Sequence, residues 1–214
     1  MTIGIIGAGA IGSNVARLFA KNGITATIAN SRGPDSLARL IAELGSSITA
    51  GTTEDAAGAD VVFVAVRWVD IEKVLNGLPA WNGRIVVDTT NPVEFLDPNS
   101  PEAKDPSNPL AAYGIRVVDL GDRYSSALVA ELVPGARLVK AFNHSPAELL
   151  TQPSAAGGQR VLFYSGDHAD AKAEVRAIIE QTGHFPVDLG ILDTGAPLTS
   201  PPFGALSTNN FVKV

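Results

Sequence analysis

Short apolar runs alternate with segments of helical periodicity along most of the chain. Residues 3–6 form the first apolar run, and the apolar positions after it recur on one face of a helix: Ile11, Val15, Leu18 and Phe19. The same alternation predicts further strands near residues 25–29, 47–50, 61–66, 84–88, 115–120, 137–142, 161–164 and 185–189. Continuous apolar strands that alternate with helices are typical of a parallel sheet covered on both faces. We therefore predict an α/β fold with a doubly wound, mostly parallel sheet.

Proline and glycine positions indicate where this pattern is interrupted. Pro34 stands where a first helical residue is expected, and Ser145–Glu148 has the sequence of a helix capping box with proline at its first helical position. Residues 91–113 hold five prolines, so they cannot form one helix and are expected to be a long loop, either functional or poorly ordered. The tail from Gly195 is again rich in proline and glycine and is expected to lie over the surface.

The pattern divides the chain into two regions. Residues 1–150 contain most of the strand–helix alternation and are predicted to form the main domain. Residues 151–214 are predicted to form a small C-terminal α/β extension that closes a cleft over this domain. So short a region closes a cleft poorly by itself, which favours a homodimer.

The composition excludes several kinds of chemistry. The 214 residues include no cysteine and three histidines, so thiolate nucleophiles, disulfides and cysteine metal sites are excluded, and the scattered histidines give no metal-ligand spacing. The net charge is −6 with no basic run, which argues against binding to nucleic acid or to anionic membranes. No basic leader precedes the first strand, and the longest apolar run is too short to span a membrane, so we expect a cytoplasmic protein.

A glycine-rich turn follows the first predicted strand. Gly7-Ala8-Gly9-Ala10-Ile11-Gly12 has the spacing G-x-G-x-x-G between a strand and an amphipathic helix, as in Rossmann-like dinucleotide-binding folds. We assign the first glycine to the tight turn, the second to close approach of a diphosphate, and the third to helix–strand packing. The N–H groups of the helix start, at Ala10, Ile11 and Gly12, would face that diphosphate. The alternative is a purely structural turn.

The end of the second strand indicates which dinucleotide is bound. Chains that bind NAD usually carry Asp or Glu there, about 20 residues after the glycine turn, bonded to the ribose 2′-hydroxyl. Here the residues are Asn30, Ser31 and Arg32, and no carboxylate occurs before Asp35. Arg32 can pair with a 2′-phosphate while the Ser31 hydroxyl donates to it. The sequence therefore favours NADP(H) over NAD(H), the alternative being that Arg32 is only a solvated loop residue.

Residues at other strand ends are candidates for the rest of the site, because ligands of open α/β sheets bind at the carboxyl ends of strands. Val66 and Arg67 follow the fourth strand and are expected beside the ribose and diphosphate. Asn91 follows the fifth strand and is expected to orient the nicotinamide, unless its turn merely caps the strand. Asn143 and His144 follow a later strand and are candidates to face the second substrate, although His144 is alternatively structural. We assign no catalytic residue beyond these last two candidates.

Three more side chains carry expectations of a simpler kind. Trp68 is expected to be a packing or lid residue rather than a stacking partner. His168 and His184 stand at the start and the end of a predicted helix and are expected at the surface. No nucleophile–base triad is visible, but hydride transfer does not need one, because holding two rings in contact supplies most of the catalysis.

Five segments carry a family resemblance: Gly7–Gly12, Asn30–Pro34, Asp88–Pro92, Ser125–Ser126 and Pro134–Asn143. They stand in the order found in NADPH-dependent coenzyme F420 reductase-like proteins, which the chain resembles over nearly its whole length. The resemblance implies that NADP(H) lies across a Rossmann-like domain and that a hydride passes between nicotinamide C4 and C5 of a deazaflavin stacked on it. It also implies the 2′-phosphate role for Ser31 and Arg32, and a place beside the nicotinamide for Asn143.

Three departures from the family pattern border the expected acceptor pocket. Arg67 stands where many relatives have proline, His144 follows Asn143 where relatives often have threonine or a small residue, and the 91–113 segment looks longer than usual. The ferric reductases of the six-transmembrane epithelial antigen family carry a similar domain and reduce a flavin. The acceptor therefore stays open between a deazaflavin and a flavin.

Three functions are compatible with these observations. The first is an NADP-dependent oxidoreductase whose small-molecule hydride acceptor is coenzyme F420 or a flavin. The second is an NADPH-dependent reductase of a small carbonyl or imine compound, although the large helical domain of β-hydroxyacid dehydrogenase-like enzymes does not fit the short region after residue 150. The third is a non-catalytic NADPH-binding sensor protein, which would lack a roomy acceptor pocket.

Overall fold

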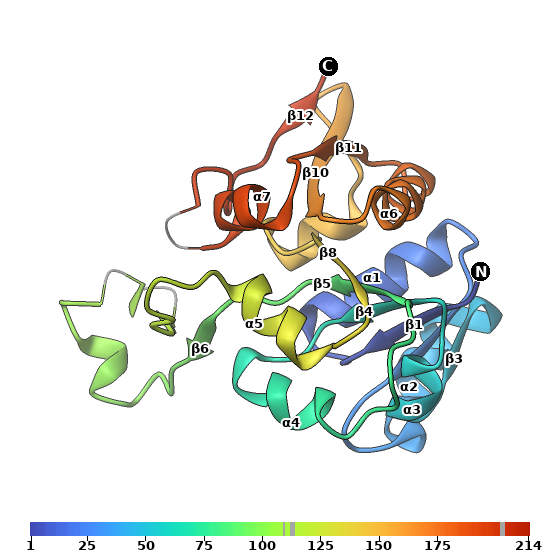
Figure 1. Ribbon diagram of the computed structural model, residues 1–214, viewed down its shortest axis with the longest axis horizontal. Helices are drawn as coiled ribbons and strands as arrows, with labels where there is room; N and C mark the ends of the chain where they lie inside the picture. The colour runs from blue at the N-terminus through green and yellow to red at the C-terminus, as the bar shows by residue number, and fades with distance from the viewer. Residues whose placement is uncertain (109, 112–113, 202–203) are drawn as a thin grey trace.

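The computed structural model describes residues 1–108, 110–111, 114–201 and 204–214 of the chain. Within them, ten strands form one central sheet with helices on both faces (Figure 1). These strands are β1 (Ile3–Ile6), β2 (Ala26–Ala29), β3 (Ile48–Ala50), β4 (Val61–Val64), β5 (Ile85–Asp88), β8 (Arg137–Ala141), β9 (Ser154–Ala155), β10 (Gly158–Gly166), β11 (Phe185–Asp188) and β12 (Val212–Lys213). Their order is β11-β10-β8-β5-β4-β1-β2-β3, and β9 and β12 pair with β10.

The sheet grows outward from β1 in two directions. β1 pairs in parallel with β2 on one side and with β4 on the other, and β5 and β8 continue the parallel order beyond β4. β10 runs antiparallel to β8, and β11 runs parallel to β10. The prediction of a Rossmann-like, mostly parallel sheet is therefore confirmed. Because the strand order reverses between β1 and β4, a ligand crevice is expected at the carboxyl ends of these two strands.

Helices cover both faces of the sheet, as the apolar strands require. They are α1 (Ala10–Lys21), α2 (Ala38–Leu44), α3 (Thr53–Ala57), α4 (Ile71–Leu75), α5 (Ser125–Leu132), α6 (Ala169–Gln181) and α7 (Leu192–Thr199), with 3₁₀ turns η1 (Pro34–Leu37), η2 (Gly45–Ser47) and η3 (Trp68–Asp70). Phe63 of β4 packs in the layer of α1 and α6, and Val62 and Val64 pack in the layer of α3, α4 and α5. In the described part of the chain, no helix combines the length and apolar character needed to cross a membrane.

The C-terminal tail contains a helix, contrary to the expectation that it lies over the surface. α7 packs against β10 and α5, and its Leu192 and Ala196 side chains are buried. A Cβ at Gly195 would lie 2.4 Å from Ser165 Cβ, so the absence of a side chain lets α7 approach β10 closely. The surface prediction is wrong for residues 195–199, because Gly195 is a packing residue and not a loop signal, whereas most of residues 204–214 are exposed or half-buried as expected.

Residues between β5 and α5 form a short arm outside the main sheet. β6 (Val93–Phe95) pairs antiparallel with β7 (Ile115–Val117) as a separate two-stranded sheet beside α5 (Figure 1). The strand expected near 115–120 is therefore shorter than predicted. η4 (Glu102–Lys104) lies between the two strands in the sequence. Pro109 and residues 112–113 of the expected proline-rich loop lie outside the described residues.

The connection after β8 also differs from its prediction. Residues Ala147–Thr151 form a 3₁₀ turn, η6, with no side-chain cap. Pro146 itself occupies the N-cap position, so Ser145 stands one residue too early for its hydroxyl to cap the turn, and the predicted capping box is wrong. Residues 151–214 then add β9 to β12, α6 and α7, and β10 and β11 extend the main sheet beyond β8.

Candidate cofactor-binding site

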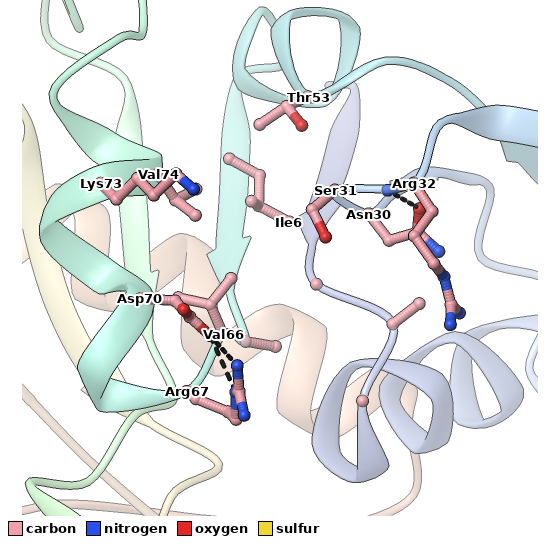
Figure 2. Close-up of a pocket in the computed structure, with 14 residues that line it drawn as sticks. Ile6, Asn30, Ser31, Arg32, Thr53, Val66, Arg67, Asp70, Lys73 and Val74 are labelled. Carbon is pink, nitrogen blue, oxygen red and sulfur yellow. Dashed lines mark hydrogen bonds and ion pairs between the residues drawn. The ribbon is translucent and has the colours of Figure 1, made fainter.

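A cavity of about 460 Å³ opens at the crevice between β1 and β4. Its walls come from the β1–α1 turn, the loop after β2, the start of α3, and the segment that runs from β4 into α4 (Figure 2). The lining residues are Ile6, Gly7, Ala8, Gly9, Asn30, Ser31, Arg32, Thr53, Ala65, Val66, Arg67, Asp70, Lys73 and Val74. The structure thus brings together the predicted glycine turn, the predicted Asn30–Arg32 loop, and the predicted pair Val66 and Arg67.

Each glycine of the turn has a separate steric reason to be glycine. Gly7 has φ of +107°, and a Cβ there would lie 2.3 Å from the Ala65 carbonyl oxygen. A Cβ at Gly12 would lie 1.9 Å from the Gly7 carbonyl oxygen, so α1 is packed directly against the turn. A Cβ at Gly9 would meet nothing within 4 Å and would project into open space. This open approach to the backbone, at the N-terminus of α1, fits a bound diphosphate.

The remaining residues of the predicted helix start do not line the cavity with their side chains. Ala10, the first residue of α1, is exposed, and Ile11 packs against the core. Their contribution to a diphosphate would be limited to the backbone N–H groups of the first helical turn, which have no partner within a helix.

Asn30 shapes the loop after β2. Its side-chain oxygen accepts a hydrogen bond from the Arg32 N–H at 2.9 Å, and its amide nitrogen donates to Ser36 Oγ at 3.0 Å. Gly33, with φ of +83°, completes the turn. The side chains of Ser31 and Arg32 are exposed and line the cavity. Asn30 thus holds the loop in place, and the side-chain donors of Ser31 and Arg32 are exposed at the cavity.

The opposite wall contains residues that the sequence reasoning missed. Asp70, Lys73 and Val74 belong to η3 and α4, and Arg67 Nη2 forms an ion pair of 2.8 Å with Asp70 Oδ2. Thr53 lines the cavity from the first residue of α3. The residues of η3 and α4 could have been predicted from their position after β4. The strand order reverses beside β4, so the first turn of the helix that follows it must face the crevice.

Asn91 and Asn143 bind each other and do not line the cavity. Asn91 Nδ2 donates to the Asn143 carbonyl oxygen at 2.8 Å, and Asn143 Nδ2 donates to Asn91 Oδ1 and to the Thr199 carbonyl oxygen, each at 3.0 Å. Asn143 is only 5% exposed, and its side-chain oxygen has no hydrogen-bond partner among the described residues. Phe142 before it adopts φ of +62°, a conformation that non-glycine residues rarely keep away from functional sites.

A buried ion pair joins the ends of β5 and β8 beside these amides. Lys140 Nζ donates a hydrogen bond to Asp88 Oδ2 at 2.9 Å and a second one to the Thr90 carbonyl oxygen. Ser126 Oγ of α5 donates to Asp88 at 3.0 Å. The sequence reasoning named the segments that hold these residues but not the pair, because register between distant strands is needed to bring them together.

The histidines and Trp68 lie where packing explains them. His144 is 1% exposed, its Nε2 accepts a hydrogen bond from the Phe163 N–H, and burial together with nearby His184 lowers its pKa to about 4. Its ring thus lies in the interior and does not face an acceptor. His184 is also 1% exposed, so its expected surface position is wrong, whereas His168 is exposed as expected. Trp68 packs against the core layer of α4, as the packing interpretation expects.

Comparison with known proteins finds a family match for the N-terminal part of the chain. The family model described as NADP oxidoreductase, coenzyme F420-dependent, matches residues 2–92. A solved structure described as a hypothetical protein of Sinorhizobium meliloti is 42% identical, with a TM-score of 0.86, and the match covers 100% of this chain and 97% of that one. A protein from Arthrobacter sp., provisionally described as an F420-dependent NADP-reductase, is 26% identical with a TM-score of 0.69, over 91% and 86% of the two chains.

One curated protein extends these similarities. The metalloreductase STEAP3 of Rattus norvegicus is 27% identical over 205 residues, which are 95% of this chain. The match covers 37% of STEAP3, so this chain spans little more than a third of that relative. Taken with the cavity at the β1–β4 crevice, the comparisons show an NADP-dependent oxidoreductase whose residues 2–92 are similar to the coenzyme F420-dependent NADP oxidoreductase family.

Proposed function

We propose that this oxidoreductase transfers a hydride between NADPH, bound in the β1–β4 cavity, and a deazaflavin or flavin acceptor. The observation that carries the proposal is the pairing of the open glycine turn with the Ser31–Arg32 loop in one cavity. Among the described lining residues the one carboxylate, Asp70, stands on the opposite wall and is bound by Arg67. No acidic group therefore occupies the β2 end, where NAD-binding chains hold the ribose 2′-hydroxyl.

We propose a place for each part of the dinucleotide from the residues that line the cavity. The N-terminus of α1 and the open side of Gly9 suit the diphosphate, and Ser31 and Arg32 suit the 2′-phosphate. Val66 and Val74 offer apolar surface to the adenosine. The nicotinamide end then extends toward the carboxyl ends of β5 and β8, where Asn91 and Asn143 lie.

NADPH supplies the hydride, so the chain needs to bind, orient and exclude water rather than act as an acid or base. The glycine turn and the two loops fix the dinucleotide along the crevice. The buried ends of β5 and β8 supply a dry, rigid base beside the nicotinamide, since Asp88, Lys140 and Asn143 are each 5% exposed or less. Holding the two rings in contact accounts for most of the rate enhancement of such a transfer.

The acceptor is testable by single-turnover kinetics. NADPH absorbance would be followed after mixing enzyme and NADPH with an F420-type deazaflavin, FMN, FAD, and a cyclic imine as a representative small substrate. We expect rapid oxidation with the deazaflavin or one of the flavins and none with the imine. Oxidation with the imine alone would favour the carbonyl or imine reductase alternative.

One observation favours the sensor alternative. The Asn143 amide, which the family resemblance places beside the nicotinamide, is sequestered by Asn91 and by the Thr199 carbonyl oxygen of the C-terminal region. If this arrangement persists with NADPH bound, the C-terminal region covers part of the acceptor side. Tight NADPH binding without oxidation by any acceptor in the panel would support the sensor and contradict the reductase.

We also propose that the chain acts as a homodimer. Phe95 of β6 is 71% exposed and Val69 beside the cofactor cavity is 53% exposed, and both line a second hollow that also includes Arg67. Exposed apolar side chains next to a site are typical of surfaces that are covered in the assembled protein. Gel filtration with light scattering tests this, and a mass of 22.2 kDa for the eluted species would contradict it.

A further inference from the structure

The cofactor cavity is rich in positive charge although the whole chain has a net charge of −6. Arg32, Arg67 and Lys73 line it, against the single carboxylate Asp70 among the described lining residues. Asp70 is engaged by Arg67. Arg32 and Lys73 form no ion pair within the described part of the chain. Two uncompensated cations in one cavity point to an anionic ligand group.

The short helix α4 holds Lys73 at the cavity wall. Ile71 and Leu75 anchor α4 in the core, at 4% and 2% exposure, and Lys73 lies between them on the exposed side. Figure 2 shows Lys73 on the wall opposite Ser31 and Arg32, and Arg67 lower in the view on the same side as Lys73. The two uncompensated cations therefore stand on opposite walls of one cavity.

We propose that Lys73 is a second determinant of NADP(H) specificity, whose ammonium group binds the adenosine 2′-phosphate from the wall opposite Arg32. This inference rests on the proposed function, which places the 2′-phosphate at Ser31 and Arg32. A phosphate monoester carries close to two negative charges at neutral pH, so one guanidinium neutralises only part of it. The diphosphate already has the N-terminus of α1 and nearby Arg67, which leaves Lys73 for the 2′-phosphate.

Titration calorimetry with small probes separates the phosphates. The probes are 2′,5′-ADP, which carries the 2′-phosphate, and 5′-ADP, which carries the diphosphate, together with NADPH and NADH. Lys73→Met removes the charge and keeps the aliphatic stem, and Lys73→Glu reverses it. Lys21→Met is the matched control, because Lys21 is also exposed and forms no ion pair among the described residues, but lies at the far end of α1, outside the cavity.

We expect Lys73→Met to lower the binding affinity for 2′,5′-ADP and for NADPH by about tenfold, as for the loss of one charge-assisted hydrogen bond. Lys73→Glu should lower both affinities more. Binding of 5′-ADP and NADH stays within about twofold of the unchanged protein for Lys73→Met, and Lys21→Met has no effect on any probe.

Two results would contradict the role of Lys73 and leave the proposed function unaffected. If wild type prefers 2′,5′-ADP and Lys73→Met keeps that preference, Lys73 does not read the 2′-phosphate. Equal losses for 2′,5′-ADP and 5′-ADP would assign Lys73 to the diphosphate or to the general field of the cavity. A wild-type protein that binds NADH as tightly as NADPH would instead contradict the NADP(H) assignment in the proposed function, and the inference with it.

Discussion

Lys140 Nζ lies 2.9 Å from Asp88 Oδ2, and the two side chains are 1% and 0% exposed. The pair connects the carboxyl ends of the parallel strands β5 and β8. Thr90 donates to Asp88 Oδ1 through both its backbone N–H and its hydroxyl, and Ser126 Oγ donates to Oδ2. The carboxylate thus holds Thr90, the residue before Asn91, together with α5 and β8, and so supports the place where we propose that the nicotinamide lies.

Breaking this pair on one side should destabilise the fold strongly. Lys140→Met leaves the Asp88 carboxylate buried without a countercharge, and we expect the free energy of unfolding to fall by about 3–5 kcal/mol. The double variant Lys140→Met/Asp88→Asn removes both charges and should recover part of the loss. Urea denaturation followed by circular dichroism measures the loss for these two variants and for the Asp88→Asn single variant. A double variant whose loss equals the sum of the two single losses would show that the side chains do not act as a pair.

Substitutions at two glycines of the turn should affect stability and NADPH binding differently. Gly12→Ala places a Cβ 1.9 Å from the Gly7 carbonyl oxygen, so α1 must shift, and we expect a loss of about 1–3 kcal/mol or more of stability. Gly9→Ala places its Cβ in open space, so the change in stability should stay within about 0.5 kcal/mol while NADPH binding is lost to the blocked approach. Thermal denaturation measures the stability of both variants, and fluorescence titration measures their affinity for NADPH. A Gly9→Ala variant that binds NADPH normally would show that no ligand approaches there.

The main sheet was predictable because its information is local. β4 is a continuous apolar run and most of β5 is apolar, and the turn from Gly7 to Gly12 identifies the strand at the centre. α7 was not predictable, because Gly195 is needed for the close packing of α7 against Ser165 of β10, a contact between distant parts of the sequence. The same limit applies to the site. Residues in the strand-end loops could be named from spacing, but Lys73 faces the cavity only because α4 is oriented by its packing.

The mutual binding of Asn91 and Asn143 shows the limit more sharply. Both were named as single candidates at strand ends. Their partnership depends on parallel pairing of β5 with β8 and on the left-handed conformation of Phe142, neither of which has a signal in the sequence around them. Candidate residues can therefore be named from their position in the sequence. Predicting the hydrogen bonds between them also requires the register of the paired strands.

Arg32 should discriminate between the two nicotinamide cofactors. Its guanidinium lines the cavity and forms no ion pair with any residue that the structure describes, so a 2′-phosphate would be its first strong partner. Loss of a hydrogen bond to a charged group costs about 1.5–3 kcal/mol, which corresponds to roughly 10- to 100-fold in affinity. Arg32→Ala should therefore raise the KM for NADPH by that factor and leave the KM for NADH nearly unchanged. Equal increases for the two cofactors would remove the assignment of Arg32 to the 2′-phosphate.

Two buried histidines should make the fold acid-sensitive. Burial lowers the pKa of His144 and of His184 from 6.5 to about 4, with the charge of His184 adding to the effect on His144 and that of Arg160 to the effect on His184. The unfolded chain therefore binds these protons more readily than the native protein. Stability is fully present above about pH 6.5 and falls as the pH drops toward 4, by about 2 kcal/mol per histidine at pH 5.

Urea denaturation at a series of pH values between these limits measures the dependence. His184→Gln should flatten the curve, because one of the two depressed groups is removed. His168→Gln is the matched control, since His168 is exposed, and its curve should follow that of the unchanged protein. A His184→Gln variant with the same pH dependence as the unchanged protein would show that His184 takes up no proton on unfolding in this range, and the acid sensitivity would then have to come from other groups.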